Sequence, residues 1–324
     1  EIAQCLVGSE MCIRDRSVHM QIMEMARGCN QSFEELPSID QQLTFSKLSI
    51  ELIRVLGIEQ LNRDILKTLE LYSDQNGFNN AAALLADTNS FKGIDIIRFG
   101  NSINEIMERK SLENISILLQ MEQCIQMFHQ YYRYEKIEGM DRKSVDKIPE
   151  RDFREAVANA LVHRMWDIPA SIKISMYSDK IEISSPGGLP AGISEDEYLN
   201  GQISLLRNPI IGNVFFRLKY IEKFGTGIMR INYAYKDALI KPDYHIFSNS
   251  IQIILPVIKS DYKLNETEKK LLNILKINGS MTRNEIEKAA EIDKSKAIRG
   301  LNRLIEKKMI QKRDLGRGTK YEIV

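Results

Sequence analysis

The sequence predicts an α+β protein in which an α/β sandwich is followed by a C-terminal winged helix-turn-helix. Two observations support this fold class. Between residues 94 and 256, segments with helical periodicity alternate with short β-rich runs, an order typical of a layered α/β domain. After a charged linker at 259–264, three helical segments precede two strands around a glycine turn, which is the order of a winged helix.

Length and composition exclude several classes of protein. The chain has 324 residues, enough for several modules, and 43% hydrophobic with 27% charged residues argues against collagen-like, low-complexity and disordered chains. It contains no uncharged apolar stretch long enough for a membrane-spanning helix. The four cysteines form no CxxC pair and have no histidine at metal-ligand spacing, so we expect no zinc site and a cytoplasmic protein.

The first sixteen residues are set apart from the rest. Residues 5–16, which include the run LVGSEMCIRDR, resemble translated sequencing adaptor rather than protein. A signal peptide is the alternative, but the segment lacks a basic start and charged residues interrupt its apolar part. We therefore interpret residues 1–16 as an artefact and expect that part of the true N-terminus is missing.

The predicted elements follow from local patterns. Apolar residues at Phe45, Leu48, Leu52 and Val55 indicate a helix, and the run ending at Gly100 indicates a strand. Further predicted elements are a mostly helical segment over 58–89, helices over 112–134, 152–163, 208–218 and 225–239, a hairpin of 172–177 with 180–184, and a strand over 250–256.

One predicted helix carries a row of polar side chains. Glu155, Asn159 and His163 stand at i, i+4 and i+8 and therefore share a helical face. An amide oxygen can ligate Mg²⁺ and a neighbouring carboxylate can orient or deprotonate water, as metal-assisted phosphoryl transfer requires. The alternative is a solvated helix face without a ligand.

Two glycine-rich loops follow this helix. Gly187 and Gly188 end a predicted strand, whereas Gly225 and Gly227 open a predicted helix, where free N–H groups suit a phosphate. The alternative is that all four are turn and cap glycines.

Four motifs in order give the chain a resemblance to a known family. It is similar to transcriptional regulators with a RecG-like C-terminal, GHKL-type ATPase domain, and the resemblance covers roughly 31–257. In complete members, an Alba-like domain related to that of Schlafen proteins precedes this region. The resemblance therefore implies a remnant of that domain and a connector over 17–57, an ATP-binding domain over 58–258, and the winged helix over 259–324. The motifs are EAVANALVHR (155–164), IEISSPGGLP (181–190), RNP (207–209) and IEKFGTGI (221–228).

The resemblance also implies roles for individual residues. Asn159 corresponds to the Mg²⁺-binding asparagine and Glu155 to the general base of some branches. Gly225 and Gly227 correspond to the lid motif, and Gly187 and Gly188 to the glycines of the middle motif. Ser185 stands where the family has an aspartate that contacts adenine. A serine hydroxyl can form a hydrogen bond with adenine but supplies no charge, so this departure from the family pattern bears on both ATP specificity and hydrolysis.

The resemblance does not imply a helicase. The chain has no GxxxxGK[ST] motif, so we expect no helicase motor and at most a weak ATPase. Arg164 and Arg207 are either phosphate contacts or structural residues. Trp166, the only tryptophan, is expected to pack in the core near the site.

The C-terminal module predicts a nucleic-acid partner. Residues 261–324 contain 16 basic and 10 acidic residues, although the whole chain has a net charge of only +1. Lys296, Arg299 and Arg303 share one face of the third helix, as on a recognition helix. The predicted wing adds basic side chains for phosphates or the minor groove, at Arg313, Arg317 and Lys320. The alternatives are a solvated charged surface or a protein-contacting winged helix.

Together these features predict a DNA-binding transcriptional regulator with a divergent nucleotide-binding domain. We expect DNA and a nucleotide, ATP with Mg²⁺, as its partners, a homo-oligomeric state, and neither a membrane nor zinc. One alternative is a Mg²⁺-dependent ATPase. The other is a dimerisation scaffold that binds no nucleotide and carries a DNA-binding module.

Overall fold

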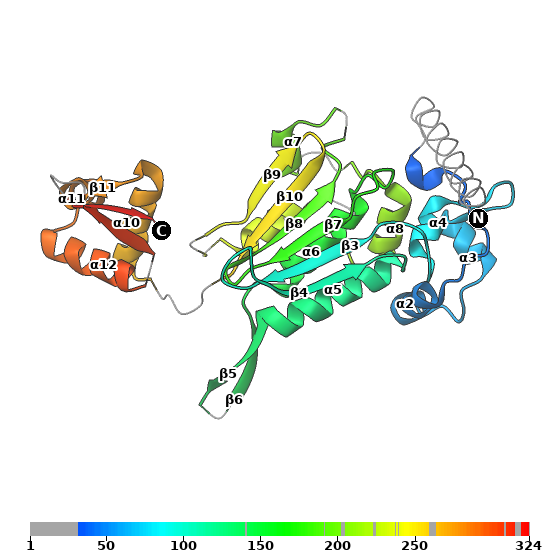
Figure 1. Ribbon diagram of the computed structural model, residues 1–324, viewed down its shortest axis with the longest axis horizontal. Helices are drawn as coiled ribbons and strands as arrows, with labels where there is room; N and C mark the ends of the chain where they lie inside the picture. The colour runs from blue at the N-terminus through cyan, green and yellow to red at the C-terminus, as the bar shows by residue number, and fades with distance from the viewer. Residues whose placement is uncertain are drawn as a thin grey trace, which may run out of the picture. The chain divides into compact units, whose positions relative to one another are not determined.

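The computed structural model describes residues 32–139, 141–190, 192–201, 205–222, 225–236, 238, 240–258, 264–307, 309–314 and 319–323. The chain divides into two compact units, Glu1–Ile258 and Lys259–Val324 (Figure 1). Within these ranges no helix has the length and apolar character needed to cross a membrane. The predicted adaptor segment, 1–16, lies outside the described residues.

Unit 1 begins with small helices and a short hairpin. Asn62 and Asn79 cap two of these helices by accepting from the backbone N–H groups of Ile65 and Ala82. The prediction of mostly helical structure over 58–89 missed the hairpin, whose second strand begins at a glycine with positive φ, Gly77. The elements are η1 (Phe33–Glu35), α2 (Ser46–Leu56), α3 (Arg63–Thr68), β1 (Tyr72–Ser73), β2 (Gly77–Phe78) and α4 (Asn80–Leu85).

A six-stranded mixed sheet forms the centre of unit 1. Its strand order is β4-β3-β7-β8-β10-β9, in which only β3 and β7 run parallel (Figure 1). The two edge strands were not predicted, because β4 and β9 carry charged or polar residues without a clean alternation. The strands are β3 (Ile94–Phe99), β4 (Ile106–Leu112), β7 (Ile172–Met176), β8 (Lys180–Pro186), β9 (Asp243–Phe247) and β10 (Ser250–Pro256).

Helices pack on this sheet and complete an α/β sandwich. Alternate residues of the central strands, such as Ile174, Ile183 and Ile253, are buried in one core with apolar residues of the helices. The predicted α+β class is confirmed, but the predicted helix over 112–134 begins later, after the N-cap Ser116. The helices are α5 (Ile117–Tyr132), α6 (Glu150–Val162), α7 (Glu195–Leu199), α8 (Pro209–Arg217) and α9 (Gly227–Ala234).

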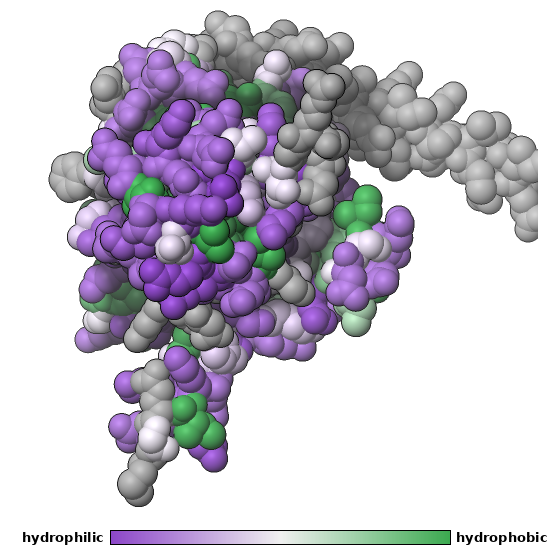
Figure 2. Space-filling view, turned by 90° about the vertical axis from the view of Figure 1, so that its left-hand side faces the viewer, coloured by the Kyte–Doolittle hydropathy of each residue, from purple (hydrophilic) through white to green (hydrophobic). Residues whose placement is uncertain are grey.

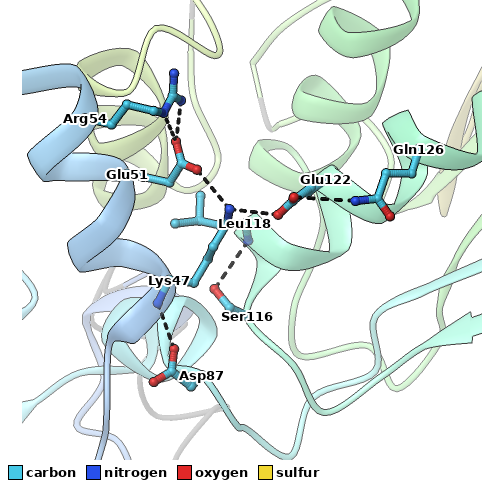
Figure 3. A network of polar contacts seen from close by, with 8 residues as sticks. All are labelled: Lys47, Glu51, Arg54, Asp87, Ser116, Leu118, Glu122 and Gln126. Atoms are coloured by element: carbon cyan, nitrogen blue, oxygen red, sulfur yellow. Dashed lines mark hydrogen bonds and ion pairs between the residues drawn. The ribbon is translucent and has the colours of Figure 1, made fainter. Parts of the chain in front are cut away.

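Helix α2 belongs to the same core as the sandwich. Leu48 and Leu52 are fully buried in it. Figure 3 shows the polar side of this contact, where Lys47 Nζ lies 2.9 Å from Glu51 Oε1 and 2.7 Å from Glu122 Oε2 of α5. Asp87 accepts from the first N–H groups of α2. The N-terminal helices are therefore fixed to the sandwich by both apolar and ionic contacts.

A long hairpin of β5 (Arg133–Glu138) and β6 (Asp141–Asp146) joins α5 to α6 and was not predicted. It projects from the sandwich at the bottom of Figure 1. Figure 2 shows the same arm at the bottom, mostly hydrophilic with one hydrophobic patch.

Unit 2 is a winged helix with its own core. Strand β13 lies between β11 and β12, and the second and third helices are joined by a short turn at Glu291, which has a positive φ. The prediction of three helices followed by two strands is confirmed. The elements are α10 (Glu266–Asn278), β11 (Met281–Thr282), α11 (Arg283–Ala290), α12 (Lys294–Glu306), β12 (Ile310–Asp314) and β13 (Thr319–Ile323).

Candidate functional sites

Helix α6 holds the predicted polar row. Glu150 and Asp152 in its first turn suit the positive end of the helix dipole. On the row itself, Asn159 Nδ2 lies 3.4 Å from Glu155 Oε1 and donates to it. This contact uses the amide nitrogen of Asn159 rather than the oxygen, which is the atom that ligates Mg²⁺.

The Glu155 carboxylate lies in a partly buried, charged environment. Burial raises its pKa, although the hydrogen bond from Asn159 and the charges of Arg230 and Arg151 act in the opposite direction. Arg230 is itself paired with Glu222, with Nη1 and Oε1 2.8 Å apart. A carboxylate with a raised pKa is a stronger base than an ordinary carboxylate.

The start of α9 lies directly on the Glu155–Asn159 row. A Cβ atom added at Gly227 would stand 2.3 Å from Glu155 Oε1 and 3.0 Å from Asn159 Nδ2, so a larger residue there would require the Glu155 carboxylate to shift. Gly225 has a φ of +63°, which also favours glycine. Both lid glycines are therefore explained by the backbone path, and that path covers the row.

The middle motif is held by contacts within the chain. The buried Ser185 hydroxyl donates to the carbonyl of Ala160 at 2.7 Å, which joins β8 to α6. Gly187 has a φ of +108°, and a Cβ at Gly188 would lie 2.3 Å from the carbonyl oxygen of Ser248. Contacts within the chain are enough to explain why serine and glycine stand at these positions. The predicted role of these residues in nucleotide binding therefore stays a prediction.

A small cavity separates α6 from the sheet. Its volume is about 20 Å³, which is room for about one water molecule. A nucleotide does not fit this space, and Tyr198 of α7 forms part of its wall. The lining residues are Asn159, Ala160, His163, Ile183, Ser185, Gly187, Tyr198, Ile251 and Ile253.

Two aromatic rings meet at the end of this cavity. The rings of His163 and Tyr198 pack edge to face with centroids 6.5 Å apart. Burial, with the nearby charge of Arg207, lowers the pKa of His163 to about 4, so its imidazole is neutral at pH 7. Burial likewise raises the pKa of Tyr198 to about 12. Both rings therefore present uncharged surfaces to the cavity.

Asp152 is a member of the polar row that the sequence analysis missed. It stands three residues before Glu155 and seven before Asn159, which places it on the same helical stripe. It is only 2% exposed, its Oδ2 has no hydrogen-bond partner, and burial raises its pKa to about 7. Its spacing was a usable signal, but an acidic residue in a first turn is also typical of ordinary helix starts.

Arg164 and Arg207, which the sequence left as either phosphate contacts or structural residues, both make contacts within the chain. Arg164 is 1% exposed, donates to the carbonyls of Lys92 and Ala170 at 2.5 and 2.7 Å, and stacks on Trp166 with its guanidinium carbon 4.1 Å from the ring centroid. Arg207 donates to the carbonyl of Gly188 at 2.5 Å. Both guanidinium groups are therefore held by backbone carbonyls of the chain, and the predicted burial of Trp166 is confirmed.

The start of α8 links the N-terminal segment to α6. The Asn208 amide donates to the carbonyls of Val162 and Arg164 at 2.7 and 2.8 Å, and so fixes the end of α6. Next to it, the buried Glu34 carboxylate accepts from the N–H groups of Ile210 and Ile211 at 2.6 and 2.9 Å. Burial raises the pKa of Glu34 to about 7 despite these two donors. A side chain from η1 thus caps a helix 176 residues later.

In unit 2, the structure places the predicted cations on the exposed side of α12. Asp293 caps the helix, and Ala297, Leu301 and Leu304 bury its opposite side. Lys296 and Arg299 are exposed. Arg303 is also exposed, at 59%, although its Nη1 lies 3.8 Å from Glu268 of α10.

The wing contributes further basic residues. Arg313 Nη1 lies 3.5 Å from Glu322 Oε2 across the two wing strands, and its side chain is 65% exposed. Lys320 lies half-buried on β13, opposite Arg313 in the register. Arg317 lies outside the described residues.

Comparisons with known proteins support the division into two kinds of domain. Residues 170–255 match the family described as "Putative ATP-dependent DNA helicase recG C-terminal". Residues 258–324 match "Sugar-specific transcriptional regulator TrmB". No curated protein matches the chain significantly. The chain therefore carries a RecG-C-terminal-type, HATPase-like domain and a TrmB-type winged-helix domain, whereas the predicted Schlafen/Alba-like remnant stays a prediction.

A solved structure is similar over most of the chain. It is the crystal structure of the DIP2311 protein from Corynebacterium diphtheriae, with a TM-score of 0.60 and 18% sequence identity. The similarity covers 93% of this chain and 66% of that chain, so this chain spans just under two thirds of the length of that protein. At this identity the likeness concerns the fold alone.

Proposed function

We propose that this protein is a DNA-binding transcriptional regulator in which the winged helix contacts DNA and the HATPase-like domain binds a nucleotide. The exposed cation face of α12 carries the proposal. Lys296, Arg299 and Arg303 project from a helix whose other side is buried, within a domain of the TrmB type. The excess of basic residues in unit 2 supports a polyanionic partner.

DNA binding is tested by fluorescence anisotropy with labelled duplex DNA at several salt concentrations. We expect the triple variant Lys296→Ala, Arg299→Ala, Arg303→Ala to lose about 100-fold in affinity and to lower the salt slope by about 2 to 3, because three phosphate contacts disappear. A control variant removes three other exposed cations of unit 2, Lys270, Lys276 and Lys288. Equal losses in both variants would contradict a specific role for α12.

For the nucleotide, we propose ATP with Mg²⁺. The donor chemistry fits, because the Asn159 oxygen would hold Mg²⁺ and Glu155 would orient water beside it. When bound, Mg²⁺ would supply charge stabilisation for the phosphates. The present conformation leaves no room for Mg²⁺-ATP beside Glu155 and Asn159, because the Gly227 backbone lies against both side chains. Binding on this row therefore requires the start of α9 to move.

This requirement suggests how the nucleotide would regulate DNA binding. A ligand shifts a conformational equilibrium only by its difference in affinity for the two states. A nucleotide that binds only when α9 is displaced would favour the displaced state. In an oligomer, that change would alter the spacing of the DNA-binding modules.

Calorimetric titration with Mg²⁺-ATP tests the nucleotide site. We expect binding to the unmodified chain and loss of binding in Asn159→Ala, because the metal ligand is removed. Asn101→Ala, an exposed asparagine outside the row, serves as the matched control. Heat of binding that persists in Asn159→Ala would place the nucleotide elsewhere.

Two alternatives rest on particular observations. The raised pKa of Glu155 favours a Mg²⁺-dependent ATPase, for which Glu155→Gln should abolish turnover without abolishing binding. The cavity of about 20 Å³ favours a scaffold without a nucleotide. For the scaffold, no nucleotide should raise the melting temperature.

A further inference from the structure

Strand β4 forms one edge of the central sheet of unit 1 (Figure 1). Among the residues that the structure describes, it pairs with β3 alone. Its seven residues include two exposed apolar side chains, Ile106 at 57% and Met107 at 60%. An edge strand presents a row of unpaired N–H and C=O groups to which a further strand can be added. The outer side of β4 is therefore a candidate contact surface.

The hydrogen bonds of β3 show which residues of β4 direct their backbone outward. The N–H of Ile172 donates to the carbonyl of Gly93 at 2.9 Å, so the odd-numbered residues of β3 face β7 and the even-numbered ones face β4. Over the regular part of the register, 108–112, even-numbered residues of β4 lie opposite even-numbered residues of β3. These residues bond to β3, whereas the N–H and C=O groups of Arg109 point away from the sheet.

The charges of β4 are complementary to those of a second copy of the same strand. Two identical antiparallel strands are related by a two-fold axis, and residues that oppose each other lie on the same face of the joined sheet. An axis through Glu108, Arg109 or Lys110 satisfies this condition, and each brings one identical pair together on the axis. Only the axis through Arg109 also creates opposite-charge pairs, because it places Glu108 of each copy opposite Lys110 of the other.

The backbone geometry favours the same axis. The outward N–H and C=O groups of the two Arg109 residues would bond to each other, which makes Glu108 and Lys110 a non-hydrogen-bonded pair, the kind whose side chains are closer. Glu108 and Lys110 are half-buried, whereas Arg109 is exposed on the opposite face, where solvent screens the repulsion between its two copies. The hydroxyl of Tyr131 on α5 donates to Glu108 Oε2 and fixes the carboxylate, which can accept further bonds.

We propose that β4 pairs in antiparallel orientation with β4 of a second copy of this chain, with the two-fold axis through Arg109. The two central sheets then form one continuous sheet. The contact uses neither the polar row of α6 nor the exposed face of α12, so it does not depend on whether unit 1 binds a nucleotide or unit 2 binds DNA.

Sedimentation equilibrium of the full chain, without DNA, tests the backbone pairing. Arg109→Pro removes the outward N–H, which β3 does not use, and should raise the dimer dissociation constant at least about 100-fold. Arg109→Gln is the matched control at the same position. It keeps the N–H and removes the like charges on the axis, so it should lower the dissociation constant by about threefold.

Charge reversal in the same experiment tests the register. Lys110→Glu and Glu108→Lys should each raise the dissociation constant about tenfold, because each brings like charges together twice. An equimolar mixture of the two variants restores both opposite-charge pairs in a mixed dimer and should associate within about threefold of the unmodified chain. Lys173→Glu, an exposed charge reversal on β7, is the control and should leave the constant unchanged.

Three results would overturn the proposal. The first is an unmodified chain that stays monomeric at the highest accessible concentration, which would leave the edge to another partner. The second is a folded Arg109→Pro variant that associates as well as the unmodified chain. The third is a mixture of the two charge variants that associates as weakly as each variant alone. Far-UV circular dichroism verifies folding, and if the proline variant does not fold, weaker association of Arg109→Gln contradicts the proposed axis.

Discussion

The polar faces of α6 and α12 both carry candidate functional residues, but the face of α6 is covered by another segment of the chain, whereas the face of α12 is exposed to solvent. On α12, Lys296 and Arg299 are exposed, and their contacts, with Asp293 and the carbonyl of Ser295, are local to the start of the helix. On α6, Glu155 and Asn159 lie beneath the backbone of Gly227. The α12 face is therefore available to a ligand as it stands, whereas the α6 row becomes available only after part of the chain moves.

The difference also affects how each face tolerates substitution. Exposed side chains on α12 can change with little effect on folding. Around α6, polar groups such as Ser185, Asn208 and Glu34 complete hydrogen bonds between buried elements. We expect substitutions there to cost stability before they affect function.

The largest effect that we expect in unit 1 is that of Glu34→Ala. It removes both acceptors of the α8 N–H groups at a fully buried position, so the free energy of unfolding of unit 1 should fall by about 2 to 3 kcal/mol. Urea denaturation followed by Trp166 fluorescence measures this change, because the only tryptophan lies in unit 1. Glu34→Gln keeps an acceptor oxygen and should lose less. Equal losses would argue against the capping contact.

Gly227→Ala tests the close contact of α9 with the polar row. The added Cβ would overlap Glu155 and contact Asn159, so we expect the same unfolding experiment to show a loss of about 1 to 3 kcal/mol. Thr226→Ala, at the preceding residue, is the matched control and should change stability little. An unchanged stability in Gly227→Ala would mean that the start of α9 moves away easily, which would weaken the contrast with α12.

Asp152→Asn tests the buried carboxylate through its pH dependence. Its pKa of about 7 in the folded state is above that of an unfolded aspartate, about 3.8, so the folded chain retains a proton that the unfolded chain loses between these values. This group's contribution to stability should therefore fall as pH rises from about 4 to 7, by at most about 1.4 kcal/mol per pH unit.

The side chain of the asparagine variant does not titrate. The free energy of unfolding of this variant should therefore exceed that of the unmodified chain most above pH 7, by about 1 to 3 kcal/mol. Denaturation curves at pH 5 and pH 8 give the comparison. A difference between the two proteins that is the same at both values would contradict a raised pKa for Asp152.

The smallest expected effect is that of Arg299→Ala on the stability of unit 2. Its side chain is exposed on α12, so we expect a change of less than about 0.5 kcal/mol in the unfolding transition, measured by scanning calorimetry. Leu301→Ala, two residues later but fully buried, should lose about 2 to 5 kcal/mol. A large loss in Arg299→Ala would remove the contrast between the two faces.

The sequence predicted the elements whose periodicity or capping is strong. In unit 2, the predicted order of three helical segments followed by two strands around a glycine turn matches the observed order of elements. In unit 1, the alternation of Ile172, Ile174 and Met176 defined β7. The strands β4 and β9 and the β5–β6 hairpin were missed, because edge and solvent-exposed strands lack an apolar face on which periodicity can be recognised.

The fold class, the order of the two domains and the side chains that share a helical face could be read from the sequence, because they follow from periodicities of 3.6 and 2 residues. Which of these faces remain accessible depends on the packing of distant segments. Glu34 and Ile210, or Gly227 and Glu155, meet only when distant segments pack. The same polar spacing therefore gives an exposed surface on α12 and a covered one on α6, because burial is set by neighbours far away in the chain.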